Sequence, residues 1–442
     1  MRELDVRIDS RPVGVLRDRD DTWEFEYTPE WIEAGDAFDL SPALPRASAR
    51  HVDGSSRRSV QWYFDNLLPE EGMRTVAAQE ARVPEQDAFG LLAFFGAESA
   101  GALVLQDPAR PLAADRGLKK LPYAALSERI GNMARVPLSH DAPKRMSIAG
   151  AQHKLLVVMR DGALFEPLPG TPSTHILKPE HLSDDDAASV ANEYFTMRLA
   201  RAMRLEVPEV EHLCVPQPIY IVRRFDRTLR DAGAVQRRHA IDTCQLLDKS
   251  RAFKYTAATV ESVAQASVLC RARAVARLQL FRWIVFNVLV GNGDCHLKNI
   301  SFLVDDRGID LAPFYDLLST AAYDTKALRD SAANWPHTHL AIGVGACRTF
   351  AEVDRESLLG AGATLGLARN TASRELDLML ERILPAADAL LAECERDFVA
   401  DALASADPAA AMAYVPQALR TLRAIRYIIL RDMVDQLTNR PR

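Results

Sequence analysis

The stretch VGNGDCHLKNISFL, residues 290–303, places several polar side chains directly behind a long apolar segment. Two ordinary explanations are a polar loop that ends a helix and a chance cluster that resembles metal ligands. A third is a phosphoryl-transfer loop, in which an Asp takes the proton of the acceptor hydroxyl and an Asn five residues later holds Mg²⁺. Asp294 and Asn299 have this spacing, although for the fragment alone a capping or turn segment is the commoner case.

Length and composition limit the classes of protein to consider. A chain of 442 residues favours two or three domains, and its 48% hydrophobic and 26% charged content is ordinary for a soluble globular protein. A formal net charge of −6 gives no indication of a stand-alone nucleic-acid binder. The charged N-terminus predicts no signal peptide, and the apolar run 278–290 is too short and too interrupted to span a membrane. Six scattered cysteines without a C-x-x-C pair favour a reducing cytoplasm over a disulfide or zinc framework.

Hydrophobic periodicity divides the chain into three parts. Residues 1–110 are β-rich, because LDVRID, PVGVL and TWEFEYT alternate apolar and polar positions, and AGALVL resembles a returning strand. Residues 111–225 alternate strands with a helix over 186–204. Residues 226–442 follow an almost entirely helical pattern. We therefore expect an α+β fold with a β-rich N-terminal subdomain, a small α/β lobe and a large all-helical C-terminal lobe.

Three charged residues outside this stretch fit the same chemistry. Lys178 ends the apolar run HILKPE, where its ammonium could contact nucleotide phosphates, and Glu193 on the following helix could hold it in place. Asp316 in PFYDLLS lies 22 residues after Asp294 and fits a second metal-binding Asp. Taken singly, an exposed strand-end Lys and a helix N-cap Asp are the commoner cases.

Two further stretches fit nucleotide binding. In SIAGAQHK, residues 147–154, small residues would let backbone N–H groups approach phosphate oxygens, although the stretch is not a Walker A motif. YIVRRFDR, residues 220–227, leaves a strand where a kinase hinge would meet adenine and ribose, with Phe225 and Asp226 in those positions. Alone, these are a turn and a strand end. Their order along the chain, however, is the order that a two-lobed protein-kinase-like fold requires.

The motifs together resemble the HipA family, kinase toxins of type II toxin–antitoxin modules whose fold is related to eukaryotic protein kinases. The resemblance rests on SIAGAQHK, HILKPE, VRRFDR, GNGDCHLKN and PFYDLLS, and on FDNLLPEEGMR near the N-terminus. It implies that Asp294 is the catalytic base, that Asn299 and Asp316 hold Mg²⁺, and that Lys178 binds phosphate of ATP. It also implies further nucleotide contacts by Ala149, Gly150, Ala151, Gln152, His153, Lys154, Arg223, Arg224, Phe225, Asp226, His296, Lys298, Tyr315 and Asp316.

The resemblance carries regulatory and partner expectations as well. Ser147 matches the serine that the family autophosphorylates in order to silence the kinase. Family members phosphorylate aminoacyl-tRNA synthetases and bind a HipB-like helix-turn-helix antitoxin, through which they reach operator DNA. Two positions depart from the family pattern: His153 stands where Glu is frequent, and Arg223 stands where the family has an acidic residue. Neither side chain touches the reacting atoms in this interpretation. The two departures therefore bear on nucleotide affinity or loop dynamics and do not imply an inactive kinase.

Three alternatives remain open or are set aside at this point. An aminoglycoside-type small-molecule kinase shares the D-x-x-x-x-N loop, but its His precedes the Asp, whereas His296 follows Asp294. A non-catalytic co-repressor that only binds the antitoxin is the second alternative. A metal hydrolase built on Asp294, Cys295 and His296 is disfavoured, because adjacent side chains in a loop rarely converge on one ion.

Overall fold

The computed structural model describes residues 1–110, 115–144, 152–230, 234–329 and 332–438. They form two compact units, each built from segments that are distant in sequence. The first contains residues 1–177, 223–254 and 301–312, and the second contains residues 178–222, 255–300 and 313–442. Boundaries at residues 110 and 225 stay predictions, whereas the mixed helix and strand content agrees with the expected α+β class.

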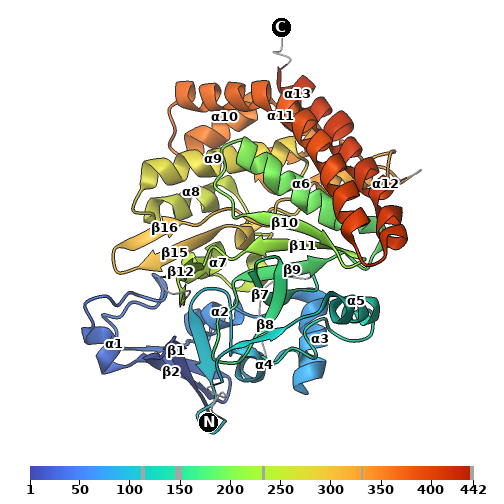
Figure 1. The fold of residues 1–442 in the computed structure, drawn as a ribbon. Coiled ribbons are helices and arrows are strands. Elements are labelled where there is room, and N and C mark those ends of the chain that lie inside the picture. The colour runs from blue at the N-terminus through green and yellow to red at the C-terminus, as the bar shows by residue number, and fades with distance from the viewer. Residues whose placement is uncertain (111–114, 145–151, 231–233, 330–331, 439–442) are drawn as a thin grey trace. The chain divides into compact units, whose positions relative to one another are not determined.

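An antiparallel five-stranded sheet with order β4–β3–β2–β1–β5 opens the first unit (Figure 1, blue). Leu4 of β1 lies opposite Leu16 of β2, which lies opposite Phe25 of β3, and all three are buried. The period-two pattern therefore produces one apolar face, as the sequence predicts. The strands are β1 (Arg2–Ile8), β2 (Arg11–Arg19), β3 (Thr22–Tyr27), β4 (Arg50–Val52) and β5 (Leu103–Gln106).

Short helices lie between and after the strands of this sheet within the first unit. Helix α4 begins behind Asp87, whose side chain accepts a hydrogen bond from the N–H of Gly90 and so caps the helix. Helix α3 has no predicted counterpart, because its sequence EGMRTVAAQEA carries only a weak apolar stripe. The helices are α1 (Pro29–Glu33), α2 (Ser59–Asp65), α3 (Glu71–Ala81), α4 (Ala88–Phe95), α5 (Tyr123–Asn132) and α7 (Thr243–Leu246).

The rest of the first unit consists of antiparallel strand pairs. Strand β7 pairs with β8 and β9, and β8 pairs with β6. Strand β15 lies between β14 and β16. The two apolar runs on either side of the D-R-G turn at residues 306–308 predict two short strands, and β15 and β16 confirm them. Bounds are β6 (Leu118–Lys120), β7 (Leu155–Arg160), β8 (Ala163–Pro167), β9 (His175–Pro179), β12 (Arg227–Leu229), β13 (Val235–Arg237), β14 (His239–Asp242), β15 (Ser301–Asp305) and β16 (Gly308–Leu311).

The second unit is mainly helical. Helix α9 (Arg273–Leu289) is apolar and almost entirely buried over its last three turns, from Leu280 onward, which places the loop after it against the core. Helix α6 (Ser189–Ala202) matches the helix predicted over 186–204, and the hairpin of β10 (Val210–Cys214) and β11 (Pro218–Arg223) follows it. The other elements before residue 365 are α8 (Val260–Leu269), β17 (His339–Val344), β18 (Cys347–Thr349) and α10 (Arg355–Thr364).

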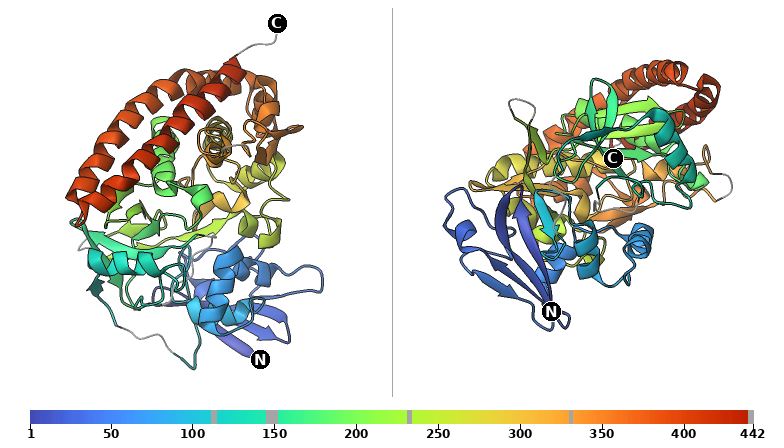
Figure 2. Two further views of the ribbon diagram at one scale, coloured as in Figure 1. Left: turned by 90° about the vertical axis from the view of Figure 1, so that its right-hand side faces the viewer. Right: turned by 60° about the horizontal axis from the view of Figure 1, so that its bottom comes forward.

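Two long helices, α11 (Arg369–Ala404) and α12 (Pro408–Ala424), run side by side (Figures 1 and 2, red). Arg198 of α6 pairs with Glu393 and Asp397 of α11, so this helical pair is attached to α6 by charge as well as by packing. After a π-helical turn (Ile425–Leu430), α13 (Arg431–Thr438) completes the unit. The helical C-terminal region is confirmed, although residues 226–442 also contain short strands that fall below the length of a clear periodic signal.

Candidate active site

The loop that carries Asp294 begins where helix α9 ends. Gly291 has a φ of +65°, a left-handed conformation that suits glycine and turns the chain out of the helix. Asn292, buried, donates from Nδ2 to Oδ1 of Asn287 at 2.8 Å and accepts at Oδ1 from the N–H of Asp294 at 3.0 Å. A buried amide therefore fixes the backbone of Asp294.

Asn299 lies in a single 3₁₀ turn, Leu297–Asn299, directly after this loop. Its side chain links two parts of the site, because Oδ1 accepts from the N–H of His296 at 3.1 Å and Nδ2 donates to Oδ2 of Asp316 at 3.0 Å. The hydroxyl of Tyr315 donates to the carbonyl of Lys298 at 2.7 Å. The two segments that the sequence proposes for metal and nucleotide binding thus lie against each other.

Lys178 lies at the centre of the acidic part of the site. Its Nζ is 2.7 and 2.9 Å from the two carboxylate oxygens of Glu193 and 2.5 Å from Oδ1 of Asp316. Helix α6 supplies Glu193, and the segment after β16 supplies Asp316. The pairing of the strand Lys with the helix Glu, which the sequence only suggests, is present in the structure.

Burial and charge act in opposite directions on Lys178. Burial lowers the pKa of this ammonium, but the carboxylates of Asp316 and Glu193 outweigh it and raise the pKa above its ordinary value. Nζ also lies 5.7 Å from the centre of the Tyr220 ring, a cation–π contact. The lysine is therefore a permanently charged group, suited to binding phosphate and unsuited to acting as a base.

Asp316 adopts an uncommon backbone conformation. Its φ of +60° lies in the left-handed region, which is unfavourable by about 1–2 kcal/mol for a residue with a Cβ. The hydrogen bonds of its carboxylate to Lys178 and Asn299 hold it there. Backbone strain of this kind is concentrated at functional sites, where a side chain must point in a direction that regular structure does not allow.

The residues present fit a magnesium ion. Mg²⁺ takes oxygen ligands, commonly one or two carboxylates together with water and substrate phosphates. The 3.0 Å contact from the amide nitrogen of Asn299 places its side chain beside the carboxylate of Asp316, so the oxygens of both residues lie near one position for an ion. The side chain of Asp316 is 31% exposed, so water and phosphate can reach it. Among the described residues, no group of three or more His, Cys, Asp and Glu side chains is arranged to hold a metal ion.

Around Asp294 and Lys178, sequence reasoning missed three residues that contact the predicted ones. They are Asn292, Tyr220, which lies beneath Lys178, and Tyr255, whose hydroxyl donates to Oδ1 of Asp294 at 2.5 Å. Tyr255 precedes Asp294 by 39 residues, and no motif joins them. A signal existed for Asn292 alone, since N-x-D in a loop after a helix is typical of a side chain that caps the chain locally.

The phosphate-loop prediction falls partly outside the described residues. Ser147, Ala149, Gly150 and Ala151 lie in 145–151, which the structure does not describe. Gln152 and Lys154, just after this segment, line a pocket of the first unit together with Met73, Val76 and Phe95. His153 is partly buried. Their contacts with nucleotide stay predictions.

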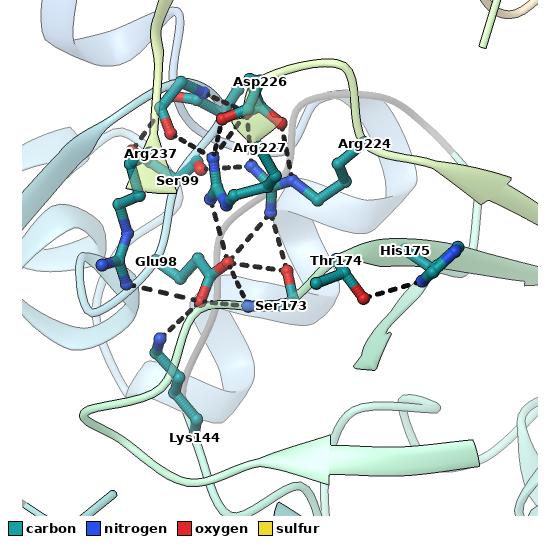
Figure 3. A network of polar contacts seen from close by, with 12 residues as sticks. Glu98, Ser99, Lys144, Ser173, Thr174, His175, Arg224, Asp226, Arg227 and Arg237 are labelled. Atoms are coloured by element: carbon teal, nitrogen blue, oxygen red, sulfur yellow. Dashed lines mark hydrogen bonds and ion pairs between the residues drawn. The ribbon is translucent and has the colours of Figure 1, made fainter. Parts of the chain in front are cut away.

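The predicted hinge residues are anchored inside the first unit (Figure 3). Phe225 packs against Ala240, Leu303 and Ala312. Arg224 donates to Asp226 from Nε at 2.9 Å and from Nη2 at 2.6 Å, and Gly101 donates its N–H to Asp226 at 2.7 Å. Because Asp226 is buried and both its oxygens accept hydrogen bonds from the protein, these contacts favour a structural role over the predicted contact with ribose. Arg223, at the end of β11, is exposed.

Glu98 is the centre of the same network and was not anticipated from the sequence. Its buried carboxylate accepts from Arg224 Nη1 at 3.1 Å, Arg227 Nη2 at 3.0 Å and Ser173 Oγ at 2.7 Å, and it pairs with Lys144 (Figure 3). Burial raises the pKa of Glu98, but the surrounding cations outweigh it and hold the pKa well below the ordinary value. A charged carboxylate thus joins the N-terminal segment to the hinge segment.

Comparison with known protein families agrees with this geometry. Residues 4–106 match the HipA N-terminal domain, and residues 146–387 match the HipA-like C-terminal domain. The chain belongs to the HipA family. A Sinorhizobium fredii protein named as a kinase, Y4mE, is 35% identical over 402 residues, which cover 87% of this chain and 91% of the relative. The serine/threonine-protein kinase toxin HipA of Shewanella oneidensis is 31% identical over 326 residues, covering 69% of this chain and 71% of that protein.

A solved HipA structure supports the same conclusion. HipA of Shewanella oneidensis MR-1, determined in complex with HipB and its operator DNA, has a TM-score of 0.73 and 25% identity, covering 98% of this chain and 99% of that one. The expected α+β, protein-kinase-like fold class is therefore confirmed, and the chain is a kinase of the HipA family.

Two further observations concern the cysteines and the possibility of a membrane-spanning helix in this HipA-family protein. All six cysteines are free thiols, and five of them are buried. None of the helices in the part of the chain that the structure describes combines the length and the apolar character needed to cross a membrane.

Proposed function

We propose that the chain is an ATP- and Mg²⁺-dependent protein kinase that transfers the γ-phosphoryl group to a serine or threonine hydroxyl. The observation that supports this most strongly is the continuous set of contacts from Glu193 through Lys178 and Asp316 to Asn299. A charged ammonium, a carboxylate and an amide oxygen are the groups that phosphoryl transfer requires at the nucleotide, and Asp294 lies five residues before Asn299.

Each residue has one task in this proposal. Lys178 binds phosphate oxygens, and Glu193 keeps its ammonium in position. Asn299 and Asp316 would hold Mg²⁺, which would neutralise phosphate charge when bound. Asp294 accepts the proton of the serine hydroxyl while the new oxygen–phosphorus bond forms and the bond to the β-phosphate oxygen breaks, leaving ADP. His296, Lys298 and Tyr315 contribute to nucleotide binding in this proposal, and residues 149–154 and 223–225 stay candidates that rest on the sequence alone.

The biological role follows from the family. We propose a toxin of a type II toxin–antitoxin module that halts translation by phosphorylating an aminoacyl-tRNA synthetase in the cytoplasm. The Shewanella relative in its complex with HipB and operator DNA supports a helix-turn-helix antitoxin as partner. A net charge of −6 favours contact with DNA mainly through that partner. Autophosphorylation of Ser147 would silence the kinase, because a phosphate adds nearly two negative charges beside a phosphate-binding loop.

Replacing the proposed base tests the activity directly. Asp294→Asn should reduce the rate of phosphate incorporation from ATP by about 10²- to 10⁴-fold, since that is the usual contribution of a general base. The same variant should relieve growth inhibition on expression. The matched control is Asp306→Asn, which alters an exposed Asp in the turn between β15 and β16. Mass spectrometry would locate the phosphate on Ser147 or on a co-expressed synthetase. Full activity in Asp294→Asn would show that Asp294 is not the base, and a non-catalytic co-repressor would incorporate no phosphate in either variant.

A further inference from the structure

Tyr255 makes an unusual contact with the proposed catalytic base. Its hydroxyl donates to Oδ1 of Asp294 at 2.5 Å, and its ring meets His296 edge to face, with 4.9 Å between ring centres and 72° between ring planes. The residue lies in the turn before helix α8 and is 43% exposed. A partly exposed phenol is therefore hydrogen-bonded to the atom group that must accept a proton during transfer.

The chemistry of this contact matches that of a phosphate acceptor. In the reaction, a serine or threonine hydroxyl must donate a hydrogen bond to the carboxylate of Asp294 before it attacks phosphorus. A tyrosine hydroxyl is the same kind of donor, and it makes this hydrogen bond from within the protein. A substrate hydroxyl that approaches Oδ1 must therefore compete with the hydroxyl of Tyr255 for this oxygen.

A supporting role for Tyr255 would call for a different environment. Groups that orient a catalytic side chain are usually locked by packing, as Asn292 is: it is 2% exposed and binds the backbone of Asp294. Tyr255, by contrast, faces solvent over much of its surface, although its hydroxyl contacts Asp294 and its ring contacts His296. A rotation about its side-chain bonds would break these two contacts.

We propose that Tyr255 is an internal occupant of the acceptor position, which keeps the base covered until a protein substrate displaces it. This inference rests on the proposed role of Asp294 and adds a regulatory element to that site. It makes the enzyme selective for acceptors that bind firmly enough to displace the phenol, and it protects ATP from attack by water.

The test uses water as the acceptor, so that no protein substrate has to be known. In Tyr255→Phe the ring stays against His296 while the hydroxyl is lost, and water gains access to Asp294. We expect ATP hydrolysis by the full chain with Mg²⁺ to rise about ten- to a hundredfold, the effect of one hydrogen bond to a charged group, with the KM for ATP unchanged. Tyr255→Ala should raise hydrolysis at least as much. Tyr427→Phe is the matched control, because it removes the hydroxyl of an exposed tyrosine on the C-terminal helical segment.

The possible results separate this inference from the proposed function. Equal or lower hydrolysis in Tyr255→Phe, in a variant whose circular dichroism and melting temperature match the parent, would overturn the gating role and indicate that Tyr255 supports the base. Asp294→Asn serves as the second reference. If it abolishes hydrolysis while Tyr255→Phe has no effect, the kinase assignment stands and the gate is rejected.

Discussion

At the scale of single residues, the site depends on how burial and hydrogen bonding adjust individual charges. Glu180 illustrates this outside the reacting groups. Its carboxylate accepts hydrogen bonds from the N–H of Ser189 and, at 2.9 Å, from the Ser189 hydroxyl. Burial outweighs these bonds and raises the pKa of Glu180 to about 7. This carboxyl holds the first turn of α6, the helix that carries Glu193.

The raised pKa predicts how stability changes with pH. Between pH 4.5, the ordinary value, and about 7, the folded protein keeps a proton on Glu180 that the unfolded chain has lost. Stability through this group is therefore greatest below that window and falls as pH rises through it, by about 3 kcal/mol. Glu180→Gln cannot titrate, so its free energy of unfolding should fall less between pH 5 and 7.5 in urea titrations. Glu381→Gln, at an exposed position of α11, should retain the parental slope, and a parental slope in Glu180→Gln would refute the assignment.

At the scale of elements, helix α6 connects the lysine proposed to bind phosphate with the segment proposed to bind metal. Asn192, next to Glu193, is fully buried and clamps the backbone of Ser319: it donates to the carbonyl at 2.9 Å and accepts from the N–H at 2.8 Å. Ser319 lies three residues after Asp316. Through this clamp the position of the helix and the direction of Asp316 are linked.

Removing the clamp should reduce both stability and catalysis. Asn192→Ala leaves the buried N–H and C=O of Ser319 without these partners, which should lower the free energy of unfolding by about 2–4 kcal/mol. The kcat of phosphate transfer should fall, because the segment that carries Asp316 loses its support. The KM for ATP should change less, because the pair of Lys178 and Glu193 is left in place. Asn370→Ala, at an exposed position near the start of α11, is the control for both measurements. A stable variant with unchanged kcat would show that Ser319 needs no such support.

Helices and strands could be predicted where a single segment of the sequence carried a clear hydrophobic periodicity or turn signal. Strands β1 to β3, helix α6 and the β15–β16 hairpin follow from periodicity and turn residues, and the spacing of Asp294 and Asn299 follows from one loop. Contacts between distant segments were not predictable. Asn192 and Ser319 are 127 positions apart, and Glu98 and Arg224 are 126 apart. No local pattern marks a buried Asn or Glu whose partners lie on another segment.

At the scale of the whole molecule, each compact unit is assembled from separate stretches of chain. The first unit joins residues 1–177 to 223–254, and Glu98 lies at that junction. Four cations, those of Lys144, Arg224, Arg227 and Arg237, lie around it, within 3.9 Å at most. Since three of them follow residue 222 in the chain, the network ties the hinge segment to the N-terminal segment.

Neutralising Glu98 should weaken this junction. Glu98→Gln leaves buried Lys144, Arg224 and Arg227 with less opposite charge, and breaking such a pair is unfavourable by about 3–5 kcal/mol. Hydrogen exchange should increase first in β12 and β13, which depend on the network, while α11 keeps its parental protection. Glu128→Gln changes an exposed Glu of the same unit and should leave exchange unaltered. Because the pKa of Glu98 lies well below its ordinary value, acidification through about pH 4.5 and below should progressively abolish the difference between the parent and Glu98→Gln. If β12 and β13 exchange as slowly in Glu98→Gln as in the parent at pH 7, then packing alone holds the two segments together.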